Sequence, residues 1–114
     1  MKLITNDETI SRSELKDMAG KMFGGLVKGV VDVSRGIMAV DAELHADEEA
    51  FLLKSGSSQD DLWGINLYPD ETGEDFIEFD SMINVRPRQG NKSRGVENAD
   101  LRSAIIGIVN DLVV

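Results

Sequence analysis

The strongest constraint on the fold is an alternation of apolar and polar residues on both sides of the turn PDETG. LWGINLYP, residues 62–69, precedes this turn, and DFIEFDSMINVRP, residues 75–87, follows it. Residues two apart in a strand share one face, so the pattern predicts an antiparallel hairpin that pairs Leu67 with Ile77. The alternate positions form a polar face made of Asn66, Tyr68, Glu78, Asp80, Asn84 and Arg86. This face is either the solvated side of the sheet or a recognition surface.

A second hairpin is predicted upstream, in LVKGVVDVSRGIMAVDAEL, residues 26–44. Gly36 lies between its two β-rich runs and accepts the positive φ that a short hairpin loop requires. In the second run, apolar residues alternate with Asp41, Glu43 and His45. We therefore expect a strand with one buried face and one polar face.

Two amphipathic helices complete the predicted fold. Residues 11–24 begin with a capping box of Ser11 and Glu14, and their apolar residues recur at helical spacing. After Asn98, a second apolar stripe of the same kind runs to Leu112. Each helix has one apolar stripe to bury, so both are expected to pack on the sheet.

The length of 114 residues predicts one α+β domain, 1–114, built in two layers. An antiparallel sheet of about four strands is expected, covered on one face by the N-terminal and the C-terminal helix. The chain has no cysteine, which excludes thiol catalysis and disulfides. Its first residues lack the apolar core of a signal peptide and no run is apolar enough to span a bilayer, so we expect a cytoplasmic protein.

Charge limits the class of partner. The net charge of -9 repels polyanions, which disfavours binding to nucleic acid or anionic membranes. One segment departs from this, because RPRQGNKSRG, residues 86–95, carries basic residues and no acid. Guanidinium groups match carboxylate and phosphate oxygens, so the segment predicts a site for an anionic small molecule or an acidic protein. The candidate ligand-binding residues are Asn84, Arg86, Arg88, Asn91 and Arg94. The alternative is a solvated connection whose arginines pair with the surplus of acids.

AELHADEE contains the only histidine of the chain among several carboxylates. Imidazole with carboxylates suits a divalent metal, and the candidate ligands are His45, Glu43 and Asp80. The alternative is a strand end followed by a short helix over residues 47–56, with Asp47 as its N-cap. This segment is also short enough to be a strand, but its N-cap, its acidic first turn and Gly56 favour the helix. Acids in a first helical turn are favoured by the helix dipole, so the second interpretation accounts for them without a ligand.

Three segments resemble a small bacterial family of about this length that is classed as a domain of unknown function. They are LHADEE, GSxQxDLWGINxYP and INxRPxQGN, where x is any residue. The resemblance covers most of the chain from the first helix onward and implies a bacterial origin. It brings with it no activity, substrate or cofactor, and it assigns no catalytic residue.

Two functions follow as hypotheses. The lack of a complete catalytic set favours a non-enzymatic binding or regulatory module that uses the polar sheet face and residues 86–95. The alternative is a divalent-metal-dependent hydrolase of a small anionic substrate, with Glu43, His45 and Asp80 at the metal. No cofactor is indicated, and a homodimer through the sheet edge or the last helix stays open.

Overall fold

The computed structural model describes residues 1–22 and 24–114. Its five strands form one antiparallel sheet, in the order β1-β3-β2-β4-β5. The strands are β1 (Lys2–Ile4), β2 (Val27–Asp32), β3 (Ile37–Val40), β4 (Leu62–Leu67) and β5 (Ile77–Glu78). The helices are α1 (Arg12–Ala19), α2 (His45–Lys54) and α3 (Ala99–Leu112). The predicted α+β class is confirmed, and the extra strand is β1, which pairs with β3.

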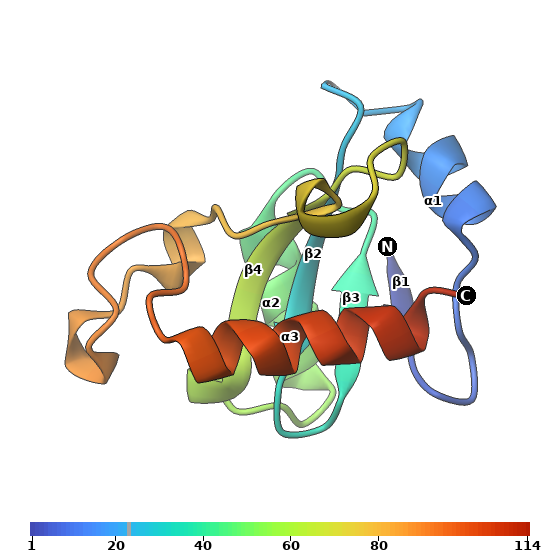
Figure 1. Ribbon diagram of the computed structural model, residues 1–114. Helices are drawn as coiled ribbons and strands as arrows, with labels where there is room; N and C mark the ends of the chain where they lie inside the picture. The colour runs from blue at the N-terminus through green and yellow to red at the C-terminus, as the bar shows by residue number, and fades with distance from the viewer. Residues whose placement is uncertain (23) are drawn as a thin grey trace.

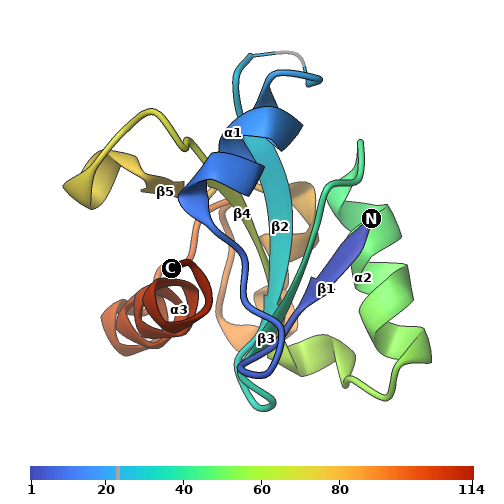
Figure 2. The ribbon, with the colours of Figure 1, turned by 90° about the vertical axis from the view of Figure 1, so that its right-hand side faces the viewer.

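Helices cover both faces of the sheet. As predicted, α1 and α3 lie on one face, while α2 packs on the opposite face (Figures 1 and 2). The alternation of β3 shows the consequence, because Met38 and Val40 join the core under α1 and α3, whereas Ile37 and Ala39 join the core under α2. The face expected to carry polar side chains along β3 is therefore buried in apolar contacts.

The two predicted hairpins form with the expected pairing. Gly36 takes a φ of 66° in the loop between β2 and β3, and Leu67 lies opposite Ile77 in β4 and β5. However, β5 ends at Glu78, and the remainder of the predicted strand is replaced by the 3-10 turns η3 (Met82–Asn84) and η4 (Pro87–Gln89).

The helix ends differ from prediction at three points. The Ser11–Glu14 capping box is present, but α1 ends at Ala19 instead of residue 24, where Gly20 weakens helical continuation. Phe23, within the predicted helix, lies outside the described residues. The helix predicted over residues 47–56 is confirmed as α2, although it begins two residues earlier and Leu44 replaces Asp47 at the N-cap.

The prediction that Asp41, Glu43 and His45 share one strand face was wrong. β3 ends at Val40, and Asp41 takes a φ of 71°, a left-handed conformation that aspartate tolerates better than most residues. This residue turns the chain away from the sheet, so that His45 becomes the first residue of α2. Alternation cannot place these side chains on one face, because the segment is no longer extended.

The two ends of the described chain are joined by backbone hydrogen bonds. The amide of Ile10 donates to the carbonyl of Leu112 at 3.0 Å, and the amide of Val114 donates to the carbonyl of Ile10 at 2.9 Å. Ile10 and Leu112 are both fully buried. Figure 2 shows the N-terminal segment crossing the sheet beside the end of α3.

Candidate functional site

The segment after β5 protects the open edge of β4 with side chains instead of a strand. The side-chain amide of Asn84 accepts from the Gly64 amide at 2.8 Å and donates to the Gly64 carbonyl at 2.9 Å. Further along the same edge, Arg86 donates to the carbonyl of Leu62. Asn84 and Arg86 therefore satisfy backbone groups that a longer β5 would have paired.

Close packing at Gly64 explains why the strand ends there. A Cβ built on Gly64 would lie 2.5 Å from the Cβ of Ser81. Ser81 thus occupies the space that a side chain at position 64 would fill. The chain can approach β4 this closely only because that residue is glycine.

Asn91 holds the loop that follows in one conformation. Its Nδ2 donates to the carbonyls of Asn84 at 2.7 Å and Gly95 at 2.8 Å, and its Oδ1 accepts from the Glu97 amide at 2.9 Å. The side chain is 4% exposed. Two of the five predicted ligand-binding residues, Asn84 and Asn91, thus have their amide groups engaged by the protein backbone.

The predicted arginines have partners within the protein. Arg86 also donates to the carbonyl of Gln59 at 2.6 Å, and its guanidinium lies 4.0 Å from the centroid of the Trp63 ring. Arg88 pairs with Asp60 at 3.5 Å, an exposed contact. Arg94 donates to Asp80 at 2.6 Å. These contacts agree with the alternative in which the arginines pair with acids and carbonyls.

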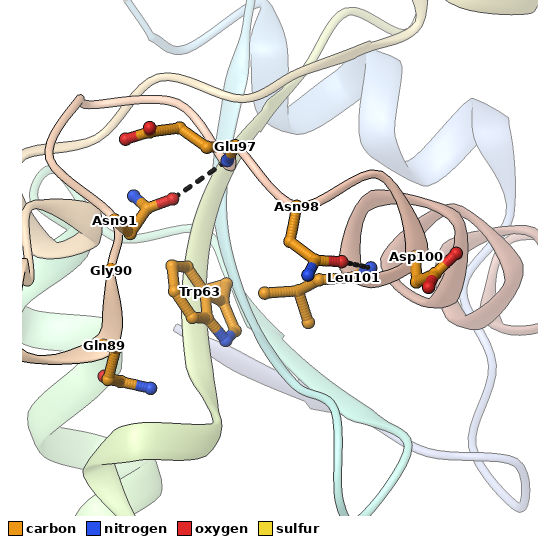
Figure 3. Close-up of a pocket in the computed structure, with 8 residues that line it drawn as sticks. All are labelled: Trp63, Gln89, Gly90, Asn91, Glu97, Asn98, Asp100 and Leu101. Carbon is orange, nitrogen blue, oxygen red and sulfur yellow. Dashed lines mark hydrogen bonds between the residues drawn. The ribbon is translucent and has the colours of Figure 1, made fainter.

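A pocket of about 650 Å³ lies between this loop and the start of α3 (Figure 3). Trp63, which is 3% exposed and belongs to the core, contributes its indole to the floor. The walls are Gln89, Gly90 and Asn91 on one side and Glu97, Asn98, Asp100 and Leu101 on the other. The volume is within the range typical of small-molecule sites.

The polar side chains that line this pocket are carboxylates and amides. Glu97 and Asp100 are acidic, and no basic side chain is among the described residues that line the pocket. The amides of Lys92 and Ser93 donate to Glu97 and lower the pKa of its carboxyl. Asn98 uses its Oδ1 to cap α3 at the Leu101 amide. The described lining therefore contains two acidic residues and no basic one, and the carboxylate of Glu97 is already bonded to backbone amides.

The three predicted metal ligands have other partners or are exposed. His45, the first residue of α2, is buried, and its Nε2 is 2.8 Å from the carbonyl oxygen of Ile65. Burial lowers the pKa of His45. Asp80 pairs with Arg94, and Glu43 is exposed in the connection before α2. Within residues 1–22 and 24–114, no three histidine or acidic side chains are grouped so as to hold a metal ion.

Glu48, which the sequence pattern assigned to the helix dipole, is instead fully buried. Its Oε2 accepts from the Ala42 amide at 3.0 Å, and its Oε1 has no partner among the described residues. Burial raises the pKa of Glu48 to about 9, so the side chain is protonated at neutral pH. Position alone did not reveal this, because the adjacent Asp47 and Glu49 remain more exposed.

Comparison with known proteins identifies the family of the chain and nothing more specific. No curated protein and no solved structure matches it. No helix of the described residues is long and apolar enough to cross a membrane. The model of a family described as "Protein of unknown function (DUF5674)" matches residues 3–112, in agreement with the resemblance carried by its motifs. The chain therefore belongs to the DUF5674 family.

Proposed function

We propose that this protein is a non-enzymatic binding module whose ligand occupies the pocket above Trp63. The observation that carries the proposal is a pocket of about 650 Å³ with one wall held in advance by buried asparagines. A wall that is already ordered reduces the conformational entropy lost when a ligand binds. Asn84 and Asn91 then hold the wall in place. Their side-chain amides already bond to the backbone, so they do not contact the ligand.

The pocket favours a ligand that differs from the one predicted from charge. An anion was expected because residues 86–95 are basic, but the pocket is lined by Glu97 and Asp100. The side-chain carbonyl of Gln89 adds an acceptor to the lining, and its Nε2 donates to the backbone carbonyl of Asp60. We infer that the ligand is a small cationic or neutral molecule rich in hydrogen-bond donors.

The hydrolase alternative has no observation in its favour. It needs Glu43, His45 and Asp80 to converge, whereas Asp80 pairs with Arg94 and His45 contacts a backbone carbonyl. The binding hypothesis uses residues that already surround one pocket, so we propose it alone.

Trp63 provides a direct test, because it is the only tryptophan and its indole N–H gives one isolated NMR signal. We would titrate the protein with putrescine, adenosine and adenosine monophosphate, which supply a cation, a neutral donor and an anion. Putrescine or adenosine is expected to shift the indole signal and the amide of Leu101, and the monophosphate to shift them least. Asp100→Asn should weaken binding of putrescine, because it removes a carboxylate from the wall.

Asp111→Asn is the matched control, since Asp111 is also exposed on α3 but does not line the pocket. It should bind putrescine as the unmodified protein does. Two results would overturn the proposal. A larger shift with adenosine monophosphate than with adenosine would mean that the pocket prefers anions. The absence of a shift with every probe would mean that the pocket is not a binding site.

A further inference from the structure

A second cavity lies on the other side of α3, against the segment that contains η2 (Gly73–Asp75) and β5. Its volume is about 520 Å³. Figure 2 shows α3 and the η2–β5 segment on the same side of the molecule. Residues of both line the cavity. The cavity is lined by Arg12, Gly73, Glu74, Phe76, Ile77, Phe79, Arg102, Ile106 and Asn110. We call it the α3–β5 groove.

The walls of the groove are largely apolar. Ile77 and Phe79 are partly buried, so each presents part of its side chain to the groove. Ile106 is 38% exposed on α3 and adds an aliphatic side chain to the lining of the groove. A ligand with an apolar body would remove this surface from water, and such burial is favourable.

Two guanidinium groups stand at this apolar surface without an acidic partner. Nη1 of Arg12 donates to the carbonyls of Pro69 and Glu71, and its guanidinium lies 4.0 Å from the Phe76 ring centroid. Nη1 of Arg102 donates to the carbonyls of Val96 and Glu97. The ion pairs within 4.0 Å among the described residues involve Lys2, Lys16, Arg88 and Arg94, and neither groove arginine.

Both arginines are held in place while keeping binding capacity. The backbone carbonyls engage only Nη1, which leaves the N–H groups of Nε and Nη2 for a second partner. These two nitrogens form the planar fork that binds a carboxylate or phosphate with two parallel hydrogen bonds. Arg12 and Arg102 are thus positioned donors that lack a carboxylate in a strongly acidic chain.

The charge of the groove differs from that of the Trp63 pocket. The groove is lined by two arginines and one acid, Glu74, whereas the Trp63 pocket is lined by two acids and no described basic residue. The net charge of the chain is -9, so a cationic lining is a local exception. It favours an anion, while the apolar walls favour a hydrocarbon body.

We propose that the α3–β5 groove binds a small amphipathic carboxylate with an aliphatic body. The carboxylate is held by the fork of Arg12 or Arg102, and the body lies on Ile77, Phe79 and Ile106. This site is separate from the pocket above Trp63 and does not depend on the function proposed for that pocket.

Methyl NMR spectra of the protein titrated with decanoate test the proposal. Decanoate is expected to shift the methyl signals of Ile77 and Ile106 and to leave the Trp63 indole unmoved. Decanol has the same body without the charge, and it should bind about tenfold more weakly because the charged hydrogen bonds are lost. Butanoate has the charge with a short body, and it should also bind weakly.

Variants separate the two parts of the site. Arg12→Gln and Arg102→Gln are each made, and at least one should weaken decanoate binding about tenfold. Ile106→Glu places a carboxylate among the apolar walls at an exposed helix position, so it should abolish binding while the helical circular dichroism is retained. Arg88→Gln is the matched control, because Arg88 is exposed and lies outside the groove.

The proposal fails if decanol binds as tightly as decanoate, since the guanidinium groups would then recognise nothing. It also fails if Ile106→Glu still binds decanoate, or if decanoate leaves the methyl groups of Ile77 and Ile106 unshifted. If an arginine variant does not fold, the Ile106→Glu variant and the decanol comparison still decide the outcome.

Discussion

The loop after β5 and the region under α2 bury polar side chains in opposite ways. In the loop, Asn84 and Asn91 each make several hydrogen bonds to backbone groups. Under α2, Glu48 makes one hydrogen bond, from the Ala42 amide, and its Oε1 has no partner among the described residues. A buried polar group that is fully paired gives rigidity, whereas an unpaired one costs stability. The comparison separates two asparagines that hold the fold from one buried carboxyl, Glu48, that weakens it.

The largest loss of stability is expected from Asn84→Ala, which removes the hydrogen bonds of a fully paired buried side chain. The substitution leaves the amide and carbonyl of Gly64 and the carbonyl of Arg94 without the Asn84 side chain. We expect the free energy of unfolding to fall by about 4 kcal/mol, because several buried groups lose their partner at once. Urea unfolding measures this change. Asn110→Ala, at an exposed position of α3, should have little effect, and equal losses for the two variants would contradict the structural role of Asn84.

The next effect concerns Glu48 and depends on pH. Its carboxyl has a pKa of about 9 in the folded chain against an ordinary value of 4.5. Between these values the unfolded chain is ionised and the folded chain is not, so the stability present below the lower value is lost as pH rises towards 9. Glu48→Gln removes this titration, so its free energy of unfolding should rise by about 4 kcal/mol relative to that of the unmodified protein between pH 5 and pH 8.

Urea unfolding of both proteins at a series of pH values checks this slope. Glu49→Gln is the control, since Glu49 is the next residue of α2 and is more exposed than Glu48. The control should keep the pH dependence of the unmodified protein. If Glu48→Gln keeps it too, the buried carboxyl is not its source.

The smallest effect is expected from Gly64→Ala, which tests the close approach at the edge of β4. The new Cβ would meet Ser81, so we expect a loss of about 2 kcal/mol from overpacking. Adding Ser81→Gly should restore part of the loss, because it removes the opposing Cβ. Gly107→Ala is the matched control on α3, where a Cβ meets nothing within 4 Å and should stabilise the helix slightly. A loss of equal size at Gly107 would show that packing is not the cause.

Local patterns predicted much of the fold because they depend on neighbouring residues. The capping box at Ser11, the hairpin loop at Gly36 and the pairing of Leu67 with Ile77 all follow from short-range spacing and are present. The packing of α2 on the sheet face opposite α1 and α3 was not predicted. Its apolar residues Phe51 and Leu52 gave no indication of the face on which they would pack.

The candidate site was harder to predict because its residues keep the spacing of a strand without forming one. Asn84 and Arg86 are two residues apart, and both side chains reach the edge of β4. Alternation therefore suggested one polar strand face, whereas tertiary contacts at Gly64 ended the strand first. The pocket residues Glu97 and Asp100 were not predicted, because the positive charge of residues 86–95 indicated a site at the arginines. Their acidic type beside a helix start was the available signal.

The hydrogen bonds between Ile10 and Leu112 have a consequence for the order of folding. They join segments that are far apart in the sequence, and β1 likewise must wait for β3 before it can pair. During synthesis on a ribosome, Ile4 and Ile10 emerge early, yet their burial requires α3, which emerges much later. The N-terminal segment therefore stays exposed to chaperones or to other chains until α3 is made, and closure of these long-range contacts is expected to be a late step of folding.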